Sequence, residues 1–362
     1  MPSAYTIIIW EKQTKLQNLE FWNHTWIIGS KLYKQAEQAL RALNDVNDLR
    51  LCPKDVEGLQ AWLVLKNRNI RSLELNLSQL ELHPGNGEHD RSIAEQLFRH
   101  LMPLDKLLTP RHHFTRLNLS YVDMYLCKDT WLKAIDVSAL SDLELIQCSF
   151  SDRFLKGLAN TEVQLRRFVM RFNFDRVYGI PMDVYTIGAL EELLNTMSPG
   201  TLKTLQLCLT NHRSILDAKA IGRHAMSIEQ LDLDIWTVQI RAGIMASLGS
   251  PVGLMEIHDL LKHASPCLNQ LALHFGPFES GISETLTHLF NCLVGFLIRR
   301  FPAIAHLFIR KQFQNTVALR SYIFPDFQAS SHSIQKATTF AFTVTLLRSQ
   351  TRVPSSNSKI SS

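Results

Sequence analysis

One spacing of apolar residues recurs along most of the chain: an apolar residue, a second three positions later, and a third two positions after that. Within each copy the second and third apolar residues flank one other residue, which is the period of a β-strand with one face buried. The spacing therefore predicts ten short strands that each point two apolar side chains at a core. The ten copies are Leu16/Leu19/Phe21, Val46/Leu49/Leu51, Ile70/Leu73/Leu75, Phe114/Leu117/Leu119, Leu140/Leu143/Leu145, Leu165/Phe168/Met170, Leu202/Leu205/Leu207, Ile228/Leu231/Leu233, Leu268/Leu271/Leu273 and Ile304/Leu307/Ile309.

Segments with helical periodicity separate these predicted strands. The second apolar positions of successive copies lie 24 to 44 residues apart, which leaves room for a helix that returns the chain to a parallel strand alongside. Repetition of that unit predicts an α/β solenoid, with a curved parallel sheet on its concave side and helices on its convex side. Helices are predicted over residues 30–43, 92–104, 183–197 and 253–264, with N-caps at Ser92 and Asp183.

The composition fits one continuous globular body. The chain of 362 residues is 46% hydrophobic and 20% charged, and no linker rich in Pro, Gly or Ser divides it before its end. We expect an N-terminal edge or partial repeat at 1–15, the solenoid at 16–325, a C-terminal cap at 326–348 and a disordered tail at 349–362. Because we find neither a secretion signal nor a membrane span, we expect an intracellular protein, cytoplasmic or nuclear.

The ten copies resemble the leucine-rich-repeat region of F-box/leucine-rich-repeat proteins, over about Leu16 to Ile309. The shortest separations fall in the range of 20–29 residues typical of leucine-rich repeats. Cys148 and Asn173 match the Cys or Asn that this repeat has three places after the last strand leucine. The resemblance implies a substrate receptor of a cullin-type ubiquitin ligase, in which an F-box precedes the repeats. Only fifteen residues precede Leu16, so we expect no F-box in this chain.

Residues between and beside the strand leucines face the concave surface, where such solenoids present their contacts. Their charges are mixed, with acidic and basic spots on different strands, which favours recognition of a protein with complementary charges. For any one of these residues a solvated position is the simpler interpretation, and as a set they are the predicted partner-binding face. The set is Trp22, Arg116, Asn118, Asp142, Glu144, Arg167, Arg171, Gln206, Asp232, Asp234 and Phe308.

No group of catalytic or metal-binding residues stands out in the sequence. The six cysteines contain no C-x-x-C pair. Asp232 and Asp234 share a strand face without an obvious third ligand, and His258 and His263 are spaced too far apart to share one face of a helix. The two glycines within residues 83–90 lack the third glycine of a dinucleotide-binding loop. We therefore expect a non-catalytic scaffold with no cofactor and no metal.

Two other functions stay open as alternatives. One is an enzyme whose site is assembled from separated repeats, for which Asp232, Asp234 and His274 are the candidate residues. The other is contact with nucleic acid or a membrane through the segment from Arg299 onward. That segment has nine Lys or Arg and one acidic residue, Asp326, and so carries a net charge of +8. Since the whole chain carries +5, the residues before Arg299 carry −3. Since the basic residues are spread out, nucleic acid is the less favoured partner.

Overall fold

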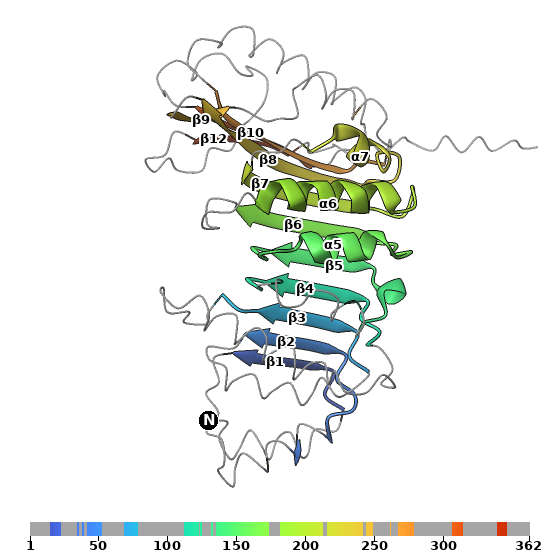
Figure 1. Ribbon diagram of the computed structural model, residues 1–362. Helices are drawn as coiled ribbons and strands as arrows, with labels where there is room; N and C mark the ends of the chain where they lie inside the picture. Colours follow the sequence, from blue (N-terminus) through green and yellow to red (C-terminus); the bar gives the residue numbers. More distant parts are fainter. Residues whose placement is uncertain are drawn as a thin grey trace, which may run out of the picture.

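The computed structural model describes the strands, three α-helices and several connecting residues of this chain (Figure 1). The described residues are 15–22, 35, 38–39, 42–52, 69–78, 112–122, 124, 132, 135–173, 182–212, 216–241, 244–248, 261, 267–278, 306–313 and 339–345. The strands are β1 (Asn18–Trp22), β2 (Asp48–Cys52), β3 (Ser72–Asn76), β4 (Arg116–Ser120), β5 (Asp142–Ile146), β6 (Arg167–Asn173), β7 (Thr204–His212), β8 (Gln230–Arg241), β9 (Ile244–Leu248), β10 (Gln270–Phe278), β11 (His306–Phe313) and β12 (Thr339–Thr345). The helices are η3 (Val137–Ala139), α5 (Asp152–Ala159), α6 (Met182–Thr196) and α7 (Ala218–Gly222).

These strands form one sheet that follows the order of the chain and does not close on itself. Nine consecutive parallel pairings run from β1 through β8 to β10 and β11. Two antiparallel strands are added: β12 pairs with β11, and β9 pairs with the extended end of β8. The protein is thus an α/β protein with a long parallel sheet in sequence order, as the apolar spacing predicts.

The predicted strand leucines whose side chains the structure describes pack into one core. Leu73, Leu143 and Leu231 belong to the same cluster of buried residues, although 158 positions separate the first from the last, and each is at most 2% exposed. The register places Leu117 directly beside Leu143, and Leu205 beside Leu231. Burying one such side chain contributes about 1.5–3 kcal/mol, so each strand depends on its neighbours for most of its stability.

The helices cover one face of the sheet. In Figure 1, α5 and α6 lie across the same side of the strands. Phe154, Leu155 and Leu158 of α5 are buried in the shared core, and so are Leu190 and Leu193 of α6. The alternation of side chains along each strand therefore leaves the polar positions on the opposite face of the sheet.

The predicted helices have different outcomes. The helix predicted over 183–197 is α6, but Asp183 is its second residue, so the prediction that Asp183 precedes the helix as its N-cap is wrong. Residues 35, 38, 39 and 42 are helical, in line with the prediction for 30–43. The helix predicted over 92–104, with its cap at Ser92, lies outside the described residues, as does that over 253–264 except for residue 261.

A repeated hydrogen-bond pattern joins the units at the edge where the strands begin. The carbonyl of the residue just before one strand accepts two successive backbone N–H groups from the next unit. Asn47 and Asp48 donate to Gln17 in this way, at 2.8 and 3.1 Å. The same pattern holds for eight acceptors, which are Gln17, Asn47, Arg71, Thr115, Ser141, Arg166, Lys203 and Glu229. Neighbouring units therefore share one local backbone geometry.

Cys148, which matches the Cys or Asn position of the repeat, contacts the neighbouring strand. The Cys148 thiol is buried and donates to the carbonyl oxygen of Leu119 on the preceding strand, with 3.1 Å between Sγ and O. The thiol thereby links two neighbouring units through a backbone acceptor of β4. The side chain of Asn173, the other predicted match, is outside the described part of the structure.

Candidate partner-binding face

The face of the sheet opposite the helices presents three rows of side-chain positions, here called the open face. The middle row is Glu20, Arg50, Glu74, Asn118, Glu144, Val169, Gln206, Asp232, Ala272 and Phe308. The row before it includes Arg116, Asp142 and Arg167. The row after it includes Trp22, Arg171, Asp234 and His274. The strand positions of all eleven residues predicted as partner contacts fall in these rows, and their role as contacts stays a prediction.

A ladder of opposite charges crosses the first three strands. The Arg50 guanidinium lies 3.7 Å from the Glu20 carboxylate and 3.3 Å from that of Glu74. The Arg50 and Glu20 side chains are 52% and 41% exposed, so each of these ion pairs contributes at most about 1 kcal/mol. None of the three residues was among the predicted contacts. The signal for them is that opposite charges recur at the same position of successive repeats.

A more buried ion pair lies at the centre of the open face. Arg167 donates from Nη1 to Oε2 of Glu144 at 3.0 Å, and the Glu144 side chain is only 12% exposed. The prediction that these two residues belong to separate acidic and basic spots is therefore wrong, because they neutralise each other. Their strands are hydrogen-bonded neighbours, but the two residues are 23 positions apart in sequence, and the sequence alone gives no register between them.

Two other predicted arginines differ in their pairing. Arg171 is exposed and donates from Nη2 to Oε1 of Gln206 at 3.4 Å, a long and weak hydrogen bond. Arg116 is exposed at the start of β4 and lies in register beside Asp142, yet among the described residues it forms no ion pair. The Asp142 carboxylate instead accepts a hydrogen bond from the Ser141 hydroxyl. The charge of Arg116 is therefore not neutralised by direct contact.

Asn118 offers less surface than the sequence suggests. It is 9% exposed, and its Oδ1 accepts a hydrogen bond from the hydroxyl of Ser120 at 3.3 Å. Val169, in the middle row two strands away, is fully buried. The accessible part of the open face therefore comes mainly from the long charged side chains and not from the short residues between them.

The residues of the enzyme alternative share the open face. The register places Asp234 between Cys208 and His274 on three adjacent strands, with Asp232 two residues earlier on the same face as Asp234. Only the backbone positions of Trp22, Asp234, His274 and Phe308 are described, so their side chains carry no further argument. Within the described part of the chain, no group of three or more His, Cys, Asp or Glu could hold a metal ion.

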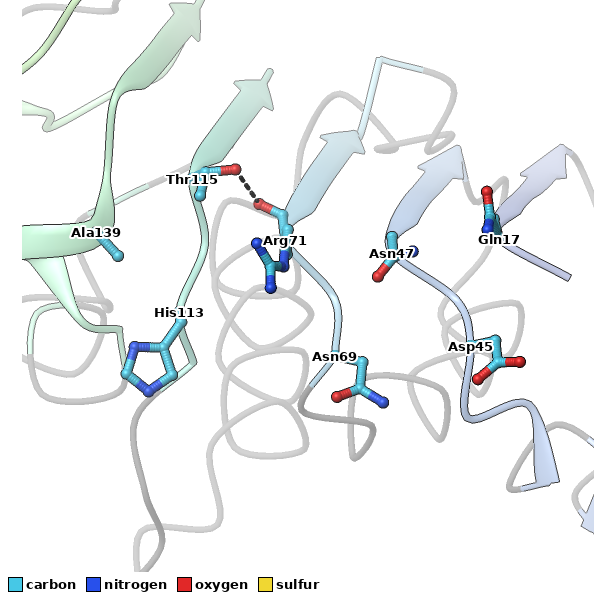
Figure 2. Close-up of a pocket in the computed structure, with 8 residues that line it drawn as sticks. All are labelled: Gln17, Asp45, Asn47, Asn69, Arg71, His113, Thr115 and Ala139. Carbon is cyan, nitrogen blue, oxygen red and sulfur yellow. Dashed lines mark hydrogen bonds between the residues drawn. The ribbon is translucent and has the colours of Figure 1, made fainter. Parts of the chain in front are cut away.

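A polar groove lies along the edge where the first strands begin, here called the leading-edge groove (Figure 2). Its volume is about 500 Å³. The lining residues occupy two equivalent positions of successive repeats, on either side of the first apolar residue. They are Gln17, Asn47, Arg71 and Thr115 directly before the strands, and Asp45, Asn69, His113 and Ala139 two residues earlier.

Contacts within the lining fix several of these side chains. The Thr115 hydroxyl donates to the Arg71 carbonyl at 3.2 Å, and Asn69 donates from Nδ2 to the Asn44 carbonyl at 2.7 Å. His113 Nδ1 lies 2.8 Å from Oδ2 of Asp136. The pKa of Asp136 is lowered from its ordinary value, mainly because the Ser138 hydroxyl donates to the carboxylate. Asp136 is thus an ionised partner that orients the His113 ring.

No protein-family model and no curated protein matches this chain. Among the described helices, none is long and apolar enough to cross a membrane. The segment after Arg299 is described only in β11 and β12, so the structure does not test a role for its basic residues.

Proposed function

We propose that this protein is a leucine-rich-repeat solenoid that acts as a non-catalytic scaffold and binds another protein through its open face. The sequence-order parallel sheet, the shared core and the repeated hydrogen bonds at the leading edge support the repeat architecture. Cys148, at the Cys or Asn position of the repeat, also links its unit to the preceding one through Leu119. Each unit closes the core of its neighbour, which makes the sheet a rigid platform.

The open face is the observation on which this proposal depends. Nine spacings of about 4.8 Å between strands give a length of about 43 Å, and a five-residue strand adds about 17 Å of width. The product is close to the ~800 Å² that each partner contributes to a standard protein–protein interface. A surface of this size with alternating charges, such as Arg50, Glu144 and Arg171, suits a protein partner better than a small molecule.

The resemblance to F-box/leucine-rich-repeat proteins suggests a more specific role. In that role the open face would hold a substrate protein for a cullin-type ubiquitin ligase. The support for this step is the resemblance of the ten repeats and not the geometry of the face. Copurification of a cullin adaptor with the protein expressed in its own cells would support the role, and its repeated absence would count against it.

An affinity pull-down with charge-altered variants tests the binding face. Arg171→Glu changes an exposed side chain with one weak hydrogen bond, so the fold should tolerate it. The double variant Glu144→Arg/Arg167→Glu inverts the central ion pair while keeping opposite charges side by side. Arg153→Glu is the matched control, since Arg153 is exposed on α5, on the helix-covered side. Loss of a prey protein with both open-face variants but not with Arg153→Glu supports the proposal, and equal recovery with all four proteins refutes it.

A second candidate, an enzyme with a site assembled from separated repeats, is favoured by one observation. Cys208, Asp234 and His274 are aligned in register on three adjacent strands. Cys, Asp and His are residue types that bind Zn²⁺. Calorimetric titration with Zn²⁺ tests this candidate. Binding of one ion that is lost in the Asp234→Asn variant would support it, and equal binding by wild type and variant would remove it.

A further inference from the structure

Two arginines of the open face form ion pairs, but two arginines at the leading edge form none with the residues that the structure describes. Arg50 pairs with Glu20 and Glu74, and Arg167 pairs with Glu144. Arg71 and Arg116 form no ion pair and no side-chain hydrogen bond among the residues that the structure describes. Both are exposed.

These two arginines lie on neighbouring strands. Arg71 directly precedes β3, and Arg116 is the first residue of β4, where it pairs in register with Ser72. Arg71 lines the leading-edge groove, and Figure 2 shows it between Thr115 and Asn47. Arg71 therefore brings to the groove a positive charge that forms no ion pair among the described residues, and Arg116, which does not line the groove, stands beside it in the open face.

The other lining groups show what kind of ligand the groove can hold. Gln17, Asn47 and Asn69 bring side-chain amides, which can both donate and accept hydrogen bonds as peptide groups do. Asp45 adds a carboxylate near the start of β2 and disfavours a second negative charge there. A polar lining of this kind suits an extended polypeptide better than the mostly apolar surface of a small ligand.

We propose that the leading-edge groove binds an extended acidic segment of a partner polypeptide, with a carboxylate side chain held by Arg71. This deepens the proposed function and rests on it for the source of the segment. The groove lies at the strand ends next to the open face, because Arg71 and Thr115 line it and the residues that follow them, Ser72 and Arg116, belong to the row before the middle row. A partner on the open face can therefore place an adjoining segment in the groove.

Fluorescence anisotropy with two labelled peptides tests this inference on the full chain. The first peptide has eight residues of alternating Glu and Ser, and the second has Gln in place of each Glu. The acidic peptide should bind about tenfold more tightly than its Gln counterpart, the difference that one charge-assisted contact provides. Arg71→Gln should remove most of this preference.

Two further variants make the test specific to the groove. Arg166 stands at the same repeat position as Arg71 but in front of β6, outside the groove, and it is exposed, so Arg166→Gln should change the affinity by less than about twofold. Asp45→Asn should bind the acidic peptide more tightly, because it removes a like charge. Unfolding temperatures equal to that of the wild type establish that each variant is folded.

The inference is overturned if the two peptides bind wild type equally, or if Arg166→Gln weakens binding as much as Arg71→Gln. Either result would mean that only general electrostatic attraction acts on the peptide. Because the assay uses a defined peptide, it does not depend on the pull-down that tests the open face. Failure of one proposal can therefore be told apart from failure of the other.

Discussion

The ion pair between Glu144 and Arg167 gives the sharpest test of the sheet register. Its atoms are 3.0 Å apart, and the side chains are 12% and 30% exposed. Removing Arg167 leaves a largely buried carboxylate without its partner, whereas removing the charge of Glu144 leaves a guanidinium that water can still reach. We therefore expect Arg167→Gln to cost about 2 kcal/mol of unfolding free energy and Glu144→Gln about 1 kcal/mol.

A double-mutant cycle separates the pair from its surroundings. The two substitutions and their combination should give a coupling of about 1–2 kcal/mol, measured by urea denaturation. The matched cycle uses Arg50 and Glu74, which lie 3.3 Å apart with side chains 52% and 28% exposed. That cycle should give less than about 1 kcal/mol and should weaken further in high salt. Coupling near zero for Glu144 and Arg167 would refute the register between β5 and β6.

Three further predictions concern the core and the buried titratable groups. Leu143→Ala, at a fully buried strand position, should lower the unfolding free energy by about 3 kcal/mol, and a loss under 1 kcal/mol in urea denaturation would contradict the shared core. Burial lowers the pKa of His224, which is fully buried with Nε2 2.7 Å from the Leu194 carbonyl. Because the unfolded state then binds the proton more strongly, the unfolding free energy should fall as the pH drops below about 6.5. In denaturation experiments from pH 7.5 to 5.5, the unfolding free energy of a His224→Gln variant should depend less on pH. Burial raises the pKa of the Cys52 thiol to about 11, so at pH 8 iodoacetamide should modify exposed Cys267 well before Cys52. Mass spectrometry of the digested protein measures the order of modification, and the opposite order would contradict this prediction.

The sequence predicts the strands well because their signal is local. The spacing of Leu73 and Leu75 within β3 is enough to place that strand and its buried face, and the other nine copies also fall in strands. The short helix α5 and the strand β9 were missed. α5 has only eight residues, and β9 forms an antiparallel pair with β8 outside the repeat. Local periodicity gives no information on such additions.

The charge pairs could not be predicted because they depend on contacts between units. Glu144 meets Arg167 only because two parallel strands align across 23 residues of sequence. The leading-edge groove is harder still, since its lining extends from Gln17 to Ala139 and comes from five repeats. Its sequence signal is a polar residue on each side of the first apolar position, which becomes meaningful only when the repeats are stacked.

The distribution of paired and unpaired charges indicates where a partner gains most. The Arg167 guanidinium already contacts the Glu144 carboxylate. A partner's carboxylate gains little net attraction there, because it must either replace this contact or meet a charge that Glu144 already neutralises. Arg71 and Arg116 have no such contact among the described residues, so a carboxylate that reaches them gains an interaction without losing another. It follows that the association rate of the partner should depend on salt through Arg71 and Arg116 and scarcely through Arg167. Stopped-flow measurements on the three Gln variants would show this difference, and equal effects would mean that the whole open face attracts the partner uniformly.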